Sequence, residues 1–275
     1  MKKCWRLHSS YLRPELEIDE VTDMERRFGG VSRLYGEAGL AKFKAAHVCV
    51  IGIGGVGSWA AEALARNAVG RITLIDLDNI AESNVNRQLH AVDGAFGKAK
   101  VTAMAERIHA INPGCDVVEI EDFVTLENAV SMLDRGYDAV LDAIDDARAK
   151  VAIAAYCRQH QLPLVITGAA GGRLDPTRIR TADLAQVTGD RLLAKVRNQL
   201  RRDHQFPKGE KTKFGIQAVY SDEQVQKPVA MCNTDTTENT AITGLNCAGY
   251  GSSVCVTAPF GMAAAALVLN LLRKP

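Results

Sequence analysis

The sequence predicts an α/β protein with a Rossmann-like, mostly parallel sheet that has helices on both faces. Short β-branched runs alternate with Ala- and Leu-rich segments between residues 47 and 172, and this alternation is typical of parallel βαβ units. The first apolar run enters a glycine-rich turn that leads into a helix, as in nucleotide-binding folds. Beyond residue 172 the alternation stops, so we expect a C-terminal extension with an irregular crossover segment and a final helix.

The glycine-rich turn is the central feature of the predicted fold. It lies between a buried strand expected at 48–51 and a helix expected at 59–67, and it contains Gly52, Gly54, Gly55 and Gly57. Glycine lets an anion approach the backbone, and the N-terminus of the helix offers unpaired N–H groups and a favourable dipole. The next strand, at 71–77, contains Asp76, which is placed to accept a hydrogen bond from a ribose hydroxyl.

This pattern leaves two alternatives open. A glycine-rich turn can serve only to pack a strand against a helix. The spacing of Gly52, Gly54 and Gly57 also suits a nicotinamide dehydrogenase as well as an ATP-dependent enzyme. The residues after Asp76 must therefore decide which nucleotide is bound.

The remaining elements follow in chain order. A helix at 24–44, interrupted near Gly29, Gly30 and Gly36, precedes the first strand. After the second strand we expect a loop at 78–97, a helix at 98–111, a strand at 116–120, a helix at 126–133, a strand at 137–141, a helix at 147–160 and a strand at 164–167. The long loop is expected to be functional, because long loops in compact domains usually are.

The C-terminal extension is less regular. We expect a strand at 178–181, a helix at 184–202, a polar crossover segment at 203–243, a stretch rich in Gly, Ser and Thr at 244–259, and a closing helix at 260–272. The chain is therefore divided into a flexible lead-in at 1–23 and one domain at 24–275. Within that domain, 47–172 is the nucleotide-binding part and 173–275 is the extension.

Composition limits the location and the partners of the protein. A formal net charge of +1 gives no global attraction for nucleic acid, so such a partner would need a local basic patch. The seven cysteines include no Cys-x-x-Cys pair, which favours reduced thiols in the cytoplasm and gives no support for a zinc site. The first residues lack the apolar run of a signal peptide.

One uncharged stretch, 239–272, raises the question of a membrane. Pro259 and Gly261 interrupt it and leave Met262–Leu272, a helix of about 16 Å that is too short for a hydrocarbon core of about 30 Å. A buried C-terminal helix in a cytoplasmic protein is the preferred interpretation. Membrane association through this stretch is the alternative.

Polar and charged residues follow the predicted strands at the edge where α/β sheets bind ligands. They are Asp76, Asp78, Asn84, Arg87, Gln88, Lys98, Lys100, Asp142, Asp145 and Asp146, with Arg33 upstream of the first strand. A dehydrogenase has no use for several cations and a metal-binding carboxylate in its cofactor cleft. An adenylating enzyme does, because attack of a carboxylate on the α-phosphate of ATP builds negative charge that Arg, Lys and Mg²⁺ stabilise.

These residues and their spacing resemble the adenylation domain of the ubiquitin-activating-enzyme superfamily, which includes the ThiF, MoeB and HesA families. The resemblance runs from about Arg33 to Ala170 and implies ATP and Mg²⁺ as cofactors. It implies that the four glycines, Asp76, Asp78, Asn84, Arg87, Gln88 and Lys100 bind ATP. It further implies that Asp145 holds the metal and that Arg33 reaches ATP across a homodimer interface, so that Arg87, Lys100, Asp145 and Arg33 are catalytic. Asp142 is the competitor of Asp145, and a helix cap is the alternative role for Asp142 and Asp146.

Further segments are similar to the tRNA threonylcarbamoyladenosine dehydratase branch of this superfamily. They are 28–36, 122–125, 167–177, 247–252 and 260–261. The branch implies adenylation of the carboxylate of threonylcarbamoyladenosine beside the tRNA anticodon, followed by ring closure that releases AMP. A nucleophile already tethered to the electrophile needs no enzyme thiol. Cys232 and Cys247 are therefore interpreted as small buried side chains rather than as nucleophiles.

A tRNA substrate needs a basic surface, and the segment 191–213 offers one. Lys195, Arg197, Arg201 and Arg202 are the candidate tRNA-binding residues. A solvated helix face beside a charged loop is the alternative interpretation of the same residues.

Two other functions stay open on the sequence alone. One is adenylation of the C-terminal glycine of a ubiquitin-like sulfur carrier protein. The other is a catalytically silent partner in a sulfur-transfer complex with a cysteine desulfurase system. Intact Arg87, Lys100 and Asp145 argue against a silent protein, and the missing cysteine pairs and the basic segment argue against the carrier function.

Overall fold

The computed structural model describes residues 23–209, 211–226 and 250–274. The expected lead-in therefore lies outside the described residues, apart from Asp23. Most of the later half of the expected crossover segment also lies outside them, as do Cys232 and Cys247.

The described helices and strands follow one another in this order: α1 (Met24–Ala45), β1 (His47–Ile51), α2 (Gly57–Arg66), β2 (Arg71–Ile75), η1 (Glu82–Asn84), α3 (Lys100–Ile111), β3 (Asp116–Ile120), α4 (Ala129–Leu133), β4 (Ala139–Asp142), α5 (Ala147–Gln159), β5 (Leu164–Thr167), η2 (Pro176–Arg178), β6 (Ile179–Asp183), η3 (Leu184–Gln186), α6 (Arg191–Asp203), β7 (Gln217–Ser221) and α7 (Val254–Arg273).

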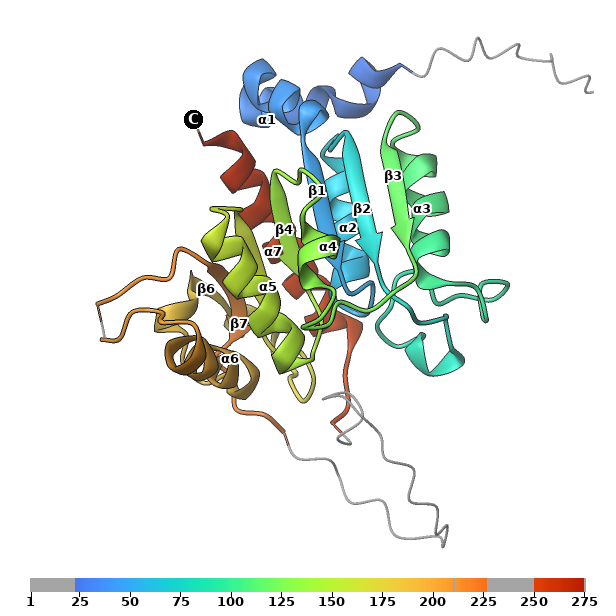
Figure 1. Ribbon diagram of the computed structural model, residues 1–275. Coiled ribbons are helices and arrows are strands. Elements are labelled where there is room, and N and C mark those ends of the chain that lie inside the picture. Colours follow the sequence, from blue (N-terminus) through green and yellow to red (C-terminus); the bar gives the residue numbers. More distant parts are fainter. Residues whose placement is uncertain (1–22, 210, 227–249, 275) are drawn as a thin grey trace, which may run out of the picture.

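One 7-stranded sheet organises the described chain, in the order β3-β2-β1-β4-β5-β7-β6 (Figure 1). The strands from β3 to β7 in this order run parallel, and β6 at the edge pairs antiparallel with β7. After β1 the chain forms β2 on one side of β1, and it later forms β4 on the other side of β1. The carboxyl ends of β1 and β4 therefore flank a switch point, where open α/β sheets bind ligands.

Alternating side chains divide the core into two layers, because successive residues of a strand point to opposite faces. Val48 and Val50 of β1 pack in a cluster with residues of α2, α3 and α7. Cys49 and Ile51 pack in a second cluster with residues of α4, α5 and α6. Figure 1 shows these two sets of helices on the two faces of the sheet. The predicted fold class is confirmed.

The closing helix is longer than the sequence predicted. α7 begins at Val254, where the Ser253 hydroxyl accepts a hydrogen bond from the Cys255 amide, and it continues through Pro259. At Gly261 an added Cβ would lie 2.4 Å from the carbonyl oxygen of Val56, so glycine allows α7 to lie close against the start of α2. The expected interruption at Pro259 is wrong, because packing against α2 and the sheet outweighs the one backbone hydrogen bond that proline removes.

Among the described residues, α7 is the one helix long and apolar enough to cross a membrane, judged by length and composition alone. The argument that this helix is too short is therefore wrong. Its buried residues, among them Phe260, Ala264 and Val268, lie in the core cluster with α2 and the sheet. An apolar helix is expected in that position without any membrane.

Besides shifts of a few residues at the ends of helices and strands, three elements differ from the prediction. The crossover segment, predicted to be irregular, contains β7, whose Ala218 and Val219 are fully buried between β5 and β6. The helix predicted at 184–202 is divided, because Gly189 has a φ of 77° and the Asp190 side chain then caps α6 through the Leu193 amide. α1 is kinked only at Gly36, and the glycines at 29 and 30 do not interrupt it.

Candidate functional site

The glycine turn joins β1 to α2 at the carboxyl edge of the sheet. Two of its glycines are required by packing: a Cβ at Gly57 would lie 1.8 Å from the carbonyl oxygen of Gly52, and a Cβ at Gly52 would lie 2.9 Å from a methyl group of Ile144. Gly54 differs, because its Cβ would meet nothing closer than the Gln88 amide nitrogen at 3.9 Å. Among the described residues, the space beside Gly54 is therefore open.

The surroundings of this space fit a polar ligand. Among the described residues, no side chain caps the first turn of α2, and the dipole at a helix N-terminus favours an anion there. The side-chain oxygen of Gln88 is buried without a hydrogen-bond partner. Because the oxygen and nitrogen of an amide are told apart only by their partners, this position suits a hydroxyl donor or, with the amide flipped, a phosphate oxygen.

Asp76 connects the glycine turn to the second strand. Its carboxylate is 7% exposed and accepts hydrogen bonds from the amide of Ile53 at 2.6 Å and from the amide of Asp78 at 2.9 Å. Burial raises the pKa of this carboxyl, and the charge of Lys100 opposes that rise. Lys100 Nζ lies 3.6 Å from Asp76 and 2.6 Å from Asp78. Asp76, which is predicted to bind the ribose, and Lys100, which is predicted to bind phosphate, are thus neighbours.

The long loop brings three further predicted residues to the same edge. The Asn84 side chain accepts from the Ala81 amide at 3.0 Å and so shapes the loop. The stem of Arg87 packs over Gly55, and its guanidinium donates to the Ser83 carbonyl at 2.8 Å and to the Asn86 side chain at 2.9 Å. Gln88 follows beside Gly54. Gln88 beside Gly54, Arg87 over Gly55 and Asp76 bonded to Ile53 therefore bring these predicted residues to the glycine turn.

His90, which the sequence did not single out for a role, contacts the glycine turn. Its ring is 4% exposed, and Nε2 lies 3.0 Å from the carbonyl oxygen of Ile53. A carbonyl can only accept, so the neutral ring carries its proton on Nε2. Burial lowers the pKa of His90 to about 4. A neutral histidine therefore stabilises the glycine turn through its hydrogen bond to Ile53.

The turn between β4 and α5 separates the three candidate carboxylates. Asp142 is fully buried and lies 2.9 Å from Lys150 Nζ, with both side chains at 0% exposure; burial raises the pKa of this carboxyl and Lys150 opposes the rise. Asp146 caps α5 through the amide of Ala149 at 2.7 Å. Asp145, between them, is half-buried, and among the described residues it has no hydrogen-bond or ion-pair partner. Of the three carboxylates, Asp145 is the one available to a ligand.

Lys150 is a second residue that the sequence did not single out. Besides its pair with Asp142, it donates to the carbonyl of Asp142 at 3.3 Å. Asp142 in turn accepts from the amide of Ile144 at 3.1 Å, and Ile144 contacts Gly52. The buried pair therefore fixes the turn that carries Asp145 against the glycine turn. A lysine within the otherwise apolar run 149–157 was the sequence signal that could have indicated its buried position.

A metal ion at this edge would not have a complete protein cage. Within the described ranges, no group of three His, Cys, Asp or Glu side chains is placed to hold a metal. Mg²⁺ usually binds through one or two carboxylates together with water and substrate phosphates. A carboxylate such as Asp145, which has no hydrogen-bond or ion-pair partner among the described residues, fits that mode of binding.

Arg33 is not brought to this site within one chain. It lies exposed on α1, and α1 covers the amino-terminal edge of the strands, opposite the glycine turn (Figure 1). Within one chain, Arg33 therefore cannot contact a nucleotide bound at the turn.

The four predicted tRNA-binding residues lie on α6, but on two of its faces. Lys195 and Arg202 are exposed, and Arg202 pairs with Asp203 at 2.7 Å. Arg197 and Arg201 are partly buried beside the segment that follows η3. The structure does not place the four on one continuous face.

Comparison with known proteins gives concordant results. The ThiF family model matches residues 28–274. A tRNA threonylcarbamoyladenosine dehydratase of Haemophilus influenzae is 46% identical over 257 residues, which cover 92% of this chain and 96% of that protein. One of Escherichia coli is 48% identical over 252 residues, which cover 90% and 93%. The solved structures of the Escherichia coli enzyme with ATP and with AMP each have a TM-score of 0.81 and 45% identity, covering 92% of this chain and 96% of that one.

The buried histidine makes stability depend on pH. Unfolded His90 takes up a proton below pH 6.5, whereas in the folded protein its pKa is about 4. Acid therefore favours the unfolded state. The contribution of His90 to the free energy of unfolding is complete above pH 6.5 and is lost progressively toward pH 4. The total loss is up to about 3 kcal/mol. We expect His90→Gln, which keeps a donor for Ile53, to reduce this loss in urea unfolding measured across that range. Exposed His109→Gln is the control; equal pH dependence in wild type and His90→Gln would contradict the assignment.

Proposed function

Since this chain belongs to the ThiF family, we propose that it catalyses the ATP-dependent cyclising dehydration of threonylcarbamoyladenosine beside the tRNA anticodon. The observation that carries the proposal is the similarity, along nearly the whole chain, to dehydratases of that name, one of which has been solved with ATP and with AMP. The open glycine turn between two strand ends supplies the matching nucleotide site. A cytoplasmic location follows from a tRNA substrate.

The reaction has two steps. An oxygen of the substrate carboxylate attacks the α-phosphate of ATP, forming an acyl adenylate as the bond to pyrophosphate breaks. A nitrogen or oxygen of the same side chain then attacks the acyl carbon, and AMP leaves with the former carboxylate oxygen. The nucleoside loses one water, and cleavage of ATP drives the change. Because both reacting groups belong to one side chain, the second step has a high effective molarity.

The residues around the turn bind different parts of ATP. The turn and the α2 N-terminus hold the phosphates, and Asp76 uses its remaining lone pairs to accept a ribose hydroxyl. Asn84, Arg87, Gln88 and Lys100 bind the triphosphate, Asp78 contributes to the nucleotide site through Lys100, and the two cations stabilise the charge that develops at the α-phosphate. Lys100 lies 2.6 Å from Asp78, so it would contact a phosphate by partly exchanging this partner.

Asp145 is the residue we propose to hold Mg²⁺, which would neutralise charge on the phosphates. The support is geometric. Asp142 is buried in its pair with Lys150 and Asp146 caps a helix. Asp145 is the one carboxylate of the three without a partner among the described residues.

The functional test is a reaction with defined tRNA. Wild-type protein, ATP and Mg²⁺ should release AMP and pyrophosphate with tRNA that carries threonylcarbamoyladenosine, and not with unmodified tRNA. The product nucleoside should be lighter by one water in mass spectrometry. Pyrophosphate formed with a ubiquitin-like carrier ending in Gly-Gly, and never with tRNA, would instead assign the chain to carrier adenylation.

Gly54 offers a separate test of the nucleotide site. In Gly54→Ala the new Cβ has room in the protein but occupies the space that we assign to phosphate. We expect ATP affinity in calorimetry to fall about tenfold or more, about 1.4 kcal/mol, with an unchanged melting temperature. Gly57→Ala is the contrast, since its Cβ meets backbone and should lower the melting temperature. Full ATP affinity in Gly54→Ala would place the phosphates elsewhere.

We also propose a homodimer in which Arg33 of each protomer reaches the ATP of its partner. Support comes from the exposed position of Arg33 on α1 and from Leu34 beside it, which is 75% exposed. Mixing Arg33→Ala with Asp145→Asn protein should restore activity, because one site of a mixed dimer then has both groups. No recovery, with subunit exchange shown separately, would remove Arg33 from the site.

The remaining partner assignments rest on the resemblance. Lys195, Arg197, Arg201 and Arg202 are proposed to contact tRNA through its phosphates. A sulfur-transfer partner of the cysteine desulfurase type stays a prediction, and failure of the two proteins to co-purify would count against it.

A further inference from the structure

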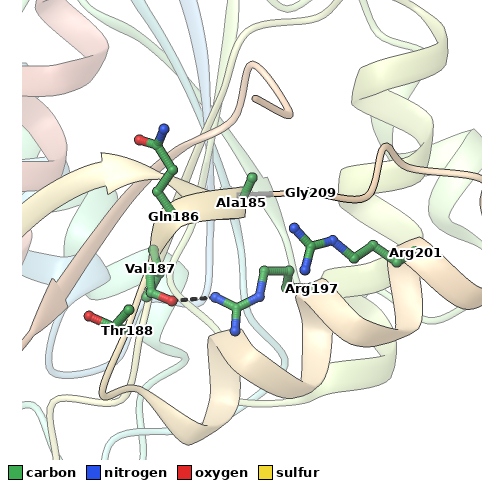
Figure 2. Close-up of a pocket in the computed structure, with 7 residues that line it drawn as sticks. All are labelled: Ala185, Gln186, Val187, Thr188, Arg197, Arg201 and Gly209. Carbon is green, nitrogen blue, oxygen red and sulfur yellow. Dashed lines mark hydrogen bonds between the residues drawn. The ribbon is translucent and has the colours of Figure 1, made fainter. Parts of the chain in front are cut away.

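A hollow of about 440 Å³ lies between α6 and the segment that joins η3 to it (Figure 2). Its lining consists of Ala185, Gln186, Val187, Thr188, Arg197, Arg201 and Gly209. Two of these seven residues are arginines and none is a carboxylate. The hollow is on the opposite face of the sheet from α2, so it is separate from the glycine turn.

Both guanidinium groups are held in place by the protein. Arg197 donates to the carbonyl of Val187, as Figure 2 shows. Arg201 donates through Nε to the carbonyl of Pro207 at 3.3 Å, and its guanidinium lies 5.4 Å from the centroid of the Phe214 ring. These contacts involve carbonyl and aromatic groups, which orient a guanidinium without neutralising its charge. A group ordered in advance loses little conformational entropy when a ligand binds.

Among the described residues, no carboxylate forms an ion pair with Arg197 or Arg201, and none lines the hollow. The pKa of Arg197 is lowered, first by burial and second by the charge of Arg201, and Arg197 Nε is buried without a hydrogen-bond partner. The adjacent Arg202 is different, because Asp203 pairs with it. Two partly buried cations on successive turns of one helix, with no acid among the described lining residues, favour an anion with several acceptor oxygens.

We propose that the hollow is a binding site for one backbone phosphate of the RNA substrate, with Arg197 and Arg201 as its ligands. This assignment rests on the proposed function and makes it more specific. The hollow is open to solvent, as a phosphodiester within a long chain requires, and exposed Lys208 adjoins the lining residue Gly209 in the sequence. It anchors the tRNA at a distance from the adenylation site, so it contributes to substrate affinity and not to ATP binding.

Arg201→Gln is the informative variant, because glutamine keeps a polar side chain and removes the charge. Arg66→Gln is the matched control: Arg66 is an exposed arginine on α2, paired with Glu62 at 2.7 Å, on the other face of the sheet. We expect Arg201→Gln to weaken binding of tRNA carrying threonylcarbamoyladenosine about tenfold, and to reduce the slope of log affinity against log salt by about one. Arg66→Gln should change neither quantity, and both variants should bind ATP as wild type does.

Each other outcome contradicts the proposal. Wild-type tRNA affinity in Arg201→Gln, or an equal loss in both variants, would remove the hollow as a phosphate site. Tight binding of inorganic phosphate that Arg201→Gln abolishes, with tRNA affinity unchanged, would assign the hollow to a free anion. Failure of wild-type protein to turn over modified tRNA would overturn the proposed function, whereas normal turnover with unchanged Arg201→Gln affinity would overturn only this phosphate site.

Discussion

The carboxylate of Asp76 is the interaction on which the nucleotide site depends. One oxygen accepts from Ile53 in the glycine turn, the other accepts from Asp78 at the start of the long loop, and Lys100 at the start of α3 lies beside both acids. A charge that is only 7% exposed is tolerated only when hydrogen bonds and an opposite charge compensate for lost water. The same compensation therefore positions three segments that are distant in sequence around one space.

The two strands that neighbour β1, namely β2 and β4, end in a similar way and serve different purposes. β2 leads into Asp76 with Lys100 from the next helix, and β4 ends in Asp142 with Lys150 from the next helix. The Asp142–Lys150 pair is fully buried, with both side chains at 0% exposure. It can therefore fix the turn before Asp145 but cannot contact a ligand. Lys100 instead reaches the half-exposed Asp78. The sheet thus places one structural pair and one pair open to a ligand on either side of the glycine turn.

Sequence patterns predicted the parts of this arrangement that depend on neighbours in the chain. The glycine turn, Asp76 and the helix starts are local features, and their spacing was sufficient to predict a nucleotide site. β7 was missed because five residues between polar flanks become a strand only through pairing with β5 and β6 on both sides. Lys150 was missed although its place in an otherwise apolar run was a signal. His90 was missed because its burial depends on packing that no local pattern shows. The division of α6 into two basic faces depends in the same way on packing against the loop after η3.

The central claim is that the substrate carboxylate is activated by ATP at the glycine turn. The most direct measurement follows the oxygen of that carboxylate, using tRNA in which the threonylcarbamoyl carboxylate carries heavy oxygen. If the carboxylate attacks the α-phosphate and AMP leaves on ring closure, one heavy oxygen must appear in AMP, and mass spectrometry of the AMP released will show it. Heavy oxygen that appears in water or in pyrophosphate, with unlabelled AMP, would contradict adenylation of the carboxylate.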